Sequence, residues 1–303
     1  MSDVSTTSQK IVPNIWSNQR AEEQAEFYAD VFRDFSSEVT GRYPTEGLPD
    51  FQKDMAGKPV TVDLQLAGTR ITIINAGPEF EPNTSVNFML NFDPVLYPDA
   101  SEYLDATFEK LADGGFVMMP KDEYPFSKKY AWVMDKFGVS WQLILTDPAG
   151  EPRPFVLPSL MFCGAAQNKA REAVSSYIEL IPGSSWGNVA EYPEQTGPAE
   201  AGTIVFSDFQ LAGQWFTAMD SAVEQPFTFN EGMSLMIIAH GQDEIDRYWA
   251  TLSTVPESEQ CGWCKDAFGL SWQVVPDNMD ELMSRPGAYE AMMQMGKLEI
   301  AKF

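Results

Sequence analysis

The chain has 303 residues, of which 44% are hydrophobic, 21% are charged and three are cysteine, and its net charge is −24. This composition excludes a disordered chain and a disulfide-built scaffold, and it supplies enough apolar residues for two domains of ordinary size. The negative charge repels phosphates and anionic lipid headgroups, so we expect neither nucleic acid nor a membrane as a partner.

Residues 1–10 are rich in Ser and Thr and have neither a basic start nor an apolar stretch. We expect them to form a disordered tail and not a signal peptide. No run in the chain approaches the roughly 18 apolar residues that a membrane-spanning helix needs. A cytoplasmic location is therefore the default expectation.

The first elements in the chain are a strand, a helix and a pair of strands. Residues 11–17 form a short apolar strand, and residues 21–32 place Ala25, Tyr28, Ala29 and Phe32 on one face of a helix. Residues 60–67 alternate apolar and polar side chains, which predicts a half-buried strand. Residues 70–75 return as its partner after a turn.

The same order then restarts. Residues 86–92 alternate as a strand, and residues 101–112 form a helix that ends at a pair of glycines, Gly114 and Gly115. Residues 130–135 and 141–145 are two further strands, joined through Phe137 and Gly138. The first half of the chain thus contains two strand–helix–strand units.

The second half repeats the first. The sequence Phe-Gly-Val-Ser-Trp-Gln at 137–142 recurs as Phe-Gly-Leu-Ser-Trp-Gln at 268–273, and Leu-Ala-Gly at 66–68 recurs at 211–213. Residues 11–15 likewise correspond to residues 156–160. The first half carries about 14 additional residues, mostly around 95–99 and 121–129. Three prolines and a glycine between 148 and 155 predict a linker. We therefore expect domains at 11–147 and 156–303.

These motifs resemble the PhnB-like branch of the glyoxalase/bleomycin-resistance/dioxygenase superfamily, also called the vicinal oxygen chelate superfamily. The closing segment, residues 261–276, is close to that branch's signature, and residues 131–142 are a degraded copy. The opening Pro13-Asn14-Ile15-Trp16 and the later Ala25-Glu26-Phe27-Tyr28 are similar to its first strand and helix. The resemblance implies an α+β fold of four βαβββ modules that form two incomplete barrels, each around a ligand cavity.

The Trp-Gln pair of the closing motif has a physical interpretation of its own. Neighbouring residues of a strand point to opposite faces of a sheet. If Trp141 and Trp272 lie in the core, Gln142 and Gln273 point to the other side, where the resemblance places the cavity.

The resemblance also implies where a metal would bind, because superfamily enzymes take one ligand, typically His or Glu, from each of four strands. The corresponding residues of the first half are Asn14, Asn75, Asn87 and Gln142, and those of the second half are Ser159, Asp220, Ser234 and Gln273. Amides and hydroxyls are weak ligands for transition metals. We therefore expect no metal and no other cofactor; if a divalent ion binds, Asp220 and Gln273 would hold it, and Asp220 favours the second half.

The remaining reactive residues give no stronger catalytic signal. His240 is the only histidine and is predicted to lie on the surface, and Cys261-Gly262-Trp263-Cys264 runs into a strand and a turn, which favours a structural role over a redox one. This branch is often labelled as 3-demethylubiquinone-9 3-methyltransferase, but the sequence has no Gly-rich loop of the type that usually binds the methyl donor.

The sequence leaves three functions open. The first hypothesis is a metal-independent protein that binds a polar small molecule through amides and aromatic walls. The alternatives are a metal-dependent lyase, isomerase or dioxygenase, and a structural or regulatory protein without catalysis. Single-domain relatives commonly pair, so two linked copies predict a pseudo-twofold monomer, with further homodimerisation left open.

Overall fold

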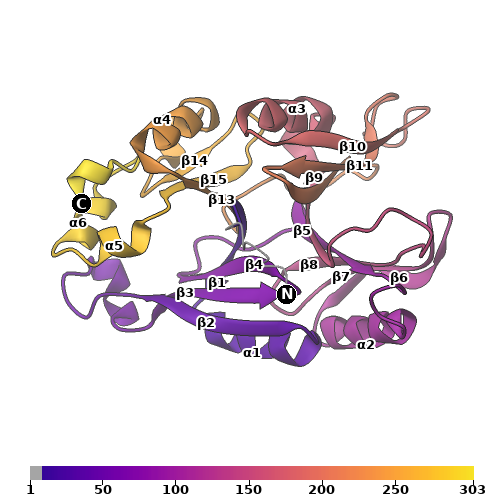
Figure 1. Ribbon diagram of the computed structural model, residues 1–303, viewed down its shortest axis with the longest axis horizontal. Coiled ribbons are helices and arrows are strands. Elements are labelled where there is room, and N and C mark those ends of the chain that lie inside the picture. Colours follow the sequence, from indigo (N-terminus) through magenta and orange to yellow (C-terminus); the bar gives the residue numbers. More distant parts are fainter. Residues whose placement is uncertain (1–8) are drawn as a thin grey trace, which may run out of the picture.

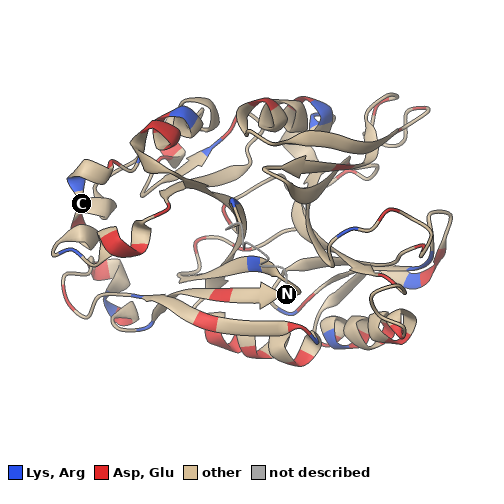
Figure 2. Ribbon diagram, in the orientation of Figure 1, with Lys and Arg blue, Asp and Glu red and all other residues tan. Residues whose placement is uncertain are grey.

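The computed structural model describes residues 9–303, so the tail predicted at 1–10 lies almost entirely outside the described residues. Within residues 9–303 no helix is both long and apolar enough to cross a membrane. Acidic residues are distributed over several helices, strands and loops and are not gathered at one site (Figure 2).

The first half contains two modules, each with one helix packed on a set of strands (Figure 1). Module 1 consists of β1 (Ile11–Asn18), α1 (Ala21–Val31), β2 (Phe35–Arg42), β3 (Pro59–Leu66) and β4 (Thr69–Ala76). Module 2 consists of β5 (Val86–Phe92), α2 (Ala100–Ala112), β6 (Phe116–Tyr124), β7 (Ser127–Met134) and β8 (Ser140–Leu145). The strands β2 and β6 were not predicted, because most of their side chains are polar or exposed.

The second half repeats this order. Module 3 consists of β9 (Val156–Phe162), α3 (Ala170–Leu180), β10 (Ser185–Glu191), β11 (Ile204–Leu211) and β12 (Gln214–Asp220). Module 4 consists of β13 (Met233–Ala239), α4 (Gly241–Leu252), β14 (Trp263–Lys265) and β15 (Ser271–Pro276), followed by α5 (Met279–Met283) and α6 (Ala288–Met293). Residues 146–155 contain neither helix nor strand.

Each sheet takes one module from each half of the chain. Sheet A has the order β14-β15-β13-β1-β4-β3-β2 and joins module 4 to module 1. Sheet B has the order β10-β11-β12-β9-β5-β8-β7-β6 and joins module 3 to module 2. The two joints are antiparallel pairs, β1 with β13 and β5 with β9. The α+β class and the tandem modules predicted from the sequence are confirmed, and the sheets do not close into barrels.

One face of each sheet packs against the helices and forms a continuous hydrophobic core. Ile11, Ile15, Trp141 and Trp272 are fully buried there. The opposite face of each sheet, turned away from the helices, is called here the distal face. Because side chains alternate along a strand, the residues between these core positions point to the distal face.

The closing motif organises a buried carboxylate in each half. Asp266 accepts hydrogen bonds from the Tyr177 hydroxyl at 2.6 Å and the Trp272 indole at 2.9 Å, and from two backbone amides. Asp135 has the same four kinds of donor, including Tyr28 and Trp141. Burial raises the pKa of both carboxyl groups. Because the tyrosine comes from one module and the tryptophan from the next, each carboxylate ties the two modules of its half together.

The additional residues of the first half lie partly in the loop between β5 and α2, which includes residues 95–99, and partly in the hairpin of β6 and β7. Module 4 has no strand that corresponds to β6, and β14 is only three residues long. The C-terminal segment occupies this place, where Met295 and Gly296 carbonyls accept hydrogen bonds from Cys261 and Gly262 amides at 2.7 and 2.8 Å. The prediction of an insertion near 121–129 therefore corresponds to this hairpin.

Candidate functional site

Six of the eight predicted site residues fall into two groups, and neither group belongs to one half of the chain. On sheet A, Asn14 of β1 lies opposite Ser234 of β13, and Gln273 of β15 donates to the Ser234 hydroxyl at 3.0 Å. This group therefore combines one residue from the first half with two from the second. The expectation of one four-residue set per half is corrected by the way the sheets assemble.

Sheet B contains the matching group. Asn87 of β5 lies opposite Ser159 of β9. The Gln142 amide of β8 donates to the Asn87 oxygen at 2.8 Å and to the Ser159 hydroxyl at 3.4 Å. All three side chains are buried. They lie on the distal face, opposite Trp141, which agrees with the orientation predicted from the Trp-Gln pair.

Asn75 and Asp220 lie on the core face and not on the distal face with the other six residues. Asn75 accepts a hydrogen bond from the amide of Ala21, at the start of α1. Asp220 accepts from the amide of Ala170, at the start of α3, and from that of Ile204. Burial raises the pKa of Asp220, partly offset by these backbone donors. Both oxygens of Asp220 are thus engaged by backbone groups.

Two threonines occupy the positions on the distal faces that had been assigned to Asn75 and Asp220. Thr72 of β4 lies beside Asn14 in register, and Thr217 of β12 lies beside Ser159. A shift of three residues along a strand moves a side chain to the other face, which explains the misplacement. The repeat itself contained the signal, because Thr72 and Thr217 are identical residues at equivalent positions of the two halves.

A carboxylate that the sequence analysis missed lies beside the sheet A group. Asp63 of β3 accepts a hydrogen bond from the Thr72 hydroxyl at 2.6 Å and pairs with Arg70 at 2.8 Å. Its counterpart in the second half, Asp208, pairs with Arg153 at 2.9 Å. Both carboxylates are already paired with an arginine. They make the edges of the distal faces polar, but they are not free to bind a metal ion.

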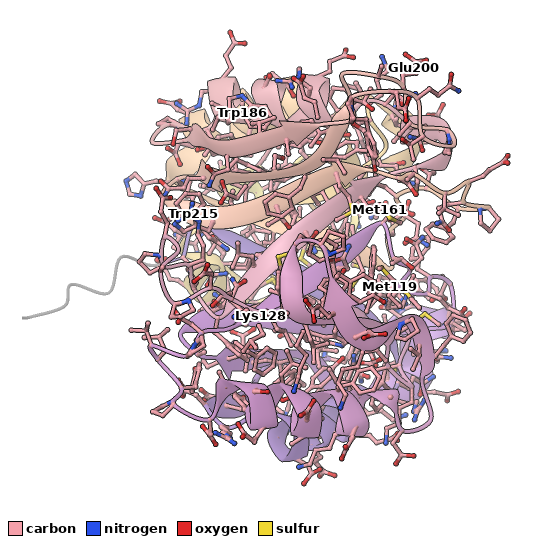
Figure 3. The ribbon with its side chains drawn as sticks, turned by 90° about the vertical axis from the view of Figure 1, so that its right-hand side faces the viewer. Met119, Lys128, Met161, Trp186, Glu200 and Trp215 are labelled. Carbon is pink, nitrogen blue, oxygen red and sulfur yellow. The ribbon has the colours of Figure 1, made fainter. Side chains whose placement is uncertain are left out.

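The walls of the two distal faces differ in how far they are exposed. On sheet A, Trp16, Met236 and Trp263 are partly exposed, and the rings of Trp16 and Trp263 are 6.1 Å apart. On sheet B, Tyr130, Trp132, Met161 and Cys163 are buried in a separate cluster, with Met118, Met119 and Met219 packed against it. Met119 of β6 and Met161 of β9 can be followed in Figure 3. Sheet A therefore presents a partly exposed aromatic wall beside Asn14, Ser234 and Gln273, which are buried, whereas on sheet B the aromatic wall is buried as well.

Two hollows in the described residues lie away from the distal faces. One, of about 430 Å³, lies beside the C-terminal segment and is lined by Glu259, Met295 and Lys297 among others. The other, of about 200 Å³, lies between the tips of the two Leu-Ala-Gly hairpins. Neither contains a predicted site residue. We place the candidate site on the distal faces because the convergent polar side chains are there.

The donor set on the distal faces does not fit a transition metal. It consists of amides and hydroxyls, which are weak ligands for such ions. Within residues 9–303, no three His, Cys, Asp or Glu side chains are grouped as a metal site would require. His240 lies at the start of α4 and is exposed, and its contact with Asp277 raises its pKa.

The three cysteines are free, and the two in the Cys-Gly-Trp-Cys sequence lie in a turn and in β14. Burial raises the pKa of Cys163 and of Cys264 to about 12. Burial also raises the pKa of Cys261. At neutral pH all three are therefore protonated thiols, which are poor nucleophiles.

The protonated, largely buried thiols are expected to react slowly in the folded chain. At pH 8 the folded chain is expected to leave Cys163 and Cys264 unreacted with a disulfide-exchange reagent, and to modify Cys261 slowly at most. In urea all three thiols should react. The reaction is followed by the absorbance of the released chromophore. Rapid modification of two thiols in the folded chain would instead indicate an accessible redox pair.

A family model described as 3-demethylubiquinone-9 3-methyltransferase matches residues 9–144 and again residues 155–275. The matches cover most of the chain, which therefore belongs to this family as a tandem of two copies. A search of the curated proteins found no match.

Several solved structures are similar to one half or to most of this chain. The PhnB protein from Bacillus cereus is 30% identical, covers 46% of this chain and 100% of its own, and has a TM-score of 0.38. A protein from Pseudomonas aeruginosa is 21% identical over 46% of this chain and 98% of its own, with a TM-score of 0.38. Glyoxalase I from Zea mays is 11% identical over 90% of this chain and 95% of its own, with a TM-score of 0.50, and shares the fold.

Proposed function

We propose that this protein binds a small molecule on the distal face of sheet A without the help of a metal ion. The observation that carries the proposal is the composition of this face. Asn14, Ser234 and Gln273 converge on it from both halves of the chain, and Trp16 and Trp263 flank them. Amides both donate and accept hydrogen bonds, and tryptophans provide apolar walls, which is the usual lining of a small-molecule site.

The chemistry available at this face favours binding over catalysis. Thr72 and Asp63 share a hydrogen bond of 2.6 Å, and Arg70 balances the carboxylate, so this group orients a polar substituent without being a free base. The thiol of Cys261, in the turn before Trp263, has a pKa that burial raises, so it is protonated at neutral pH. The cytoplasmic location and the pseudo-twofold monomer expected from the sequence are part of the same proposal.

Native mass spectrometry of the protein as purified, without added metal, is the first test. We expect the bare chain or the chain with an organic adduct, at the mass of a monomer. One divalent ion per chain that survives dialysis would contradict metal-independent binding and would favour the metal-dependent alternative.

A compound library followed by thermal unfolding then tests the site itself. We expect at least one compound to raise the melting temperature, and Gln273→Leu to abolish that rise because the amide oxygen and nitrogen are lost. Gln65→Leu is the matched control, since Gln65 is exposed on β3 of the same sheet. No response from any compound would favour the structural alternative. A response that survives Gln273→Leu would place the site elsewhere.

A further inference from the structure

The repeat gives the two distal faces equivalent positions, and a difference at one of these positions decides whether the glutamine of the face accepts a hydrogen bond from within the chain. Counting from the closing motif, Trp132 corresponds to Trp263 and Gln142 corresponds to Gln273. Tyr130 corresponds to Cys261 in the same alignment. A large aromatic residue therefore stands beside the glutamine in sheet B, where sheet A has a small one.

Tyr130 makes the contacts on sheet B that a bound molecule would make. Its side chain is 4% exposed, and its ring is part of the buried cluster with Trp132, Met161 and Cys163. Its hydroxyl donates to the Gln142 oxygen at 2.6 Å. The amide nitrogen of Gln142 is directed at Asn87, so the glutamine is fully engaged.

On sheet A only the oxygen of the corresponding glutamine is available. The Gln273 nitrogen donates to Ser234, and among residues 9–303 no donor reaches the Gln273 oxygen. Cys261 does not take the place of the tyrosine, because its backbone is left-handed with φ 53° and its sulfur lies 3.7 Å from the sulfur of Met293. Gln273 is 8% exposed, against 2% for Gln142.

The hairpin of β6 and β7 holds Tyr130 in position. The rings of Tyr124 and Phe126 pack edge-on against Tyr130 at 5.5 and 5.0 Å. Lys121 and Lys129, one from each strand of the hairpin, both pair with Asp105 of α2 at 2.8 Å. The hairpin has no counterpart in module 4, so the closure is confined to sheet B.

We propose that Tyr130 is an internal ligand: it occupies a latent binding site for a phenol on the distal face of sheet B, while sheet A remains the face open to an external molecule. The statement about sheet A rests on the function proposed above, and the statement about Tyr130 does not. The phenol group is the class of ligand because the tyrosine supplies one aromatic ring and one hydroxyl donor, and Gln142 accepts from that hydroxyl.

Removal of the side chain tests the proposal, with p-cresol as the probe because it reproduces the tyrosine side chain. We expect Tyr130→Ala to lower the melting temperature by roughly 5–10 °C, as the loss of a buried aromatic side chain does. Millimolar p-cresol should then raise the melting temperature of this variant saturably and leave that of the native protein unchanged. Toluene, which lacks the hydroxyl, should give a clearly smaller rise.

The double variant Tyr130→Ala, Gln142→Leu distinguishes a site that recognises the hydroxyl group from a cavity that accepts any ring of the right size. It should respond equally to p-cresol and toluene, because the acceptor for the hydroxyl has been removed. Equal responses already in Tyr130→Ala, or no response to p-cresol, would overturn the proposal.

A second variant keeps the test decisive if Tyr130→Ala does not fold. Tyr130→Phe retains the ring and removes the hydroxyl, so the Gln142 oxygen loses its donor. We expect the side-chain amide resonances of Gln142 to shift in the NMR spectrum, with the fold retained. Unchanged resonances would contradict the internal-ligand contact. All these readouts concern sheet B, so they are independent of whether the native protein binds a compound on sheet A.

Discussion

Replacing Asp266 by alanine is expected to lower the free energy of unfolding by about 3–5 kcal/mol. The carboxylate is 3% exposed and accepts hydrogen bonds from the Tyr177 hydroxyl, the Trp272 indole and the amides of Phe268 and Leu270. Its removal leaves three buried donors and one partly buried donor without an acceptor, and it also loosens the attachment of α3 to β15. Urea unfolding, monitored by tryptophan fluorescence, measures the change through the shift in midpoint.

Two control variants show how much of the lost stability is due to the buried carboxylate itself. Tyr177→Phe removes one donor and leaves the acceptor with three others, so we expect a cost of about 1–2 kcal/mol. Asp54→Ala removes an exposed carboxylate and should change the stability by less than about 0.5 kcal/mol. If Asp266→Ala costs no more than Tyr177→Phe, the carboxylate does not organise the closing motif.

The two halves of the chain are expected to depend on each other for stable folding. Residues 9–150 and residues 151–303, produced separately and then mixed, are expected to combine into a one-to-one complex. Neither half has its full sheet alone, because β1 loses β13 and β5 loses β9. Each half would then expose two unpaired strand edges, which favours association or aggregation.

Light scattering coupled to size-exclusion chromatography measures this assembly. The mixture should elute at the mass of the intact chain, and each half alone should elute as a self-associated species or precipitate. The intact chain, expected to elute as a monomer, is the reference. Two well-folded monomeric halves that do not combine would show that the joints between modules contribute little to stability.

The sequence predicted the local elements well because they depend on local patterns. The helix expected at 21–32 is α1 (Ala21–Val31), and the alternation around Trp141 and Trp272 correctly placed the following glutamines on the other face. The glycines of the same motif, Gly138 and Gly269, have φ of 83° and 85°, a conformation that glycine adopts without strain.

The sequence did not predict which strand edges join. Each half repeats the same order of elements, and nothing in that order states whether β1 pairs with a strand of its own half or of the other. The four-residue sets were therefore grouped by half, whereas Asn14 faces Ser234 and Asn87 faces Ser159. A comparison of identical residues at equivalent positions would also have found Thr72 and Thr217.

The shared construction of sheet A couples binding to the integrity of the whole chain. A molecule on its distal face would touch Asn14 from the first half and both Ser234 and Gln273 from the second. Such a molecule acts as a non-covalent crosslink, because it binds only while β1 and β13 are paired. By mass action a ligand at 100 times its dissociation constant adds about 2.7 kcal/mol to the association of the halves. A chain cleaved in the linker at 146–155 would thus be held together more tightly in the presence of its ligand than in its absence.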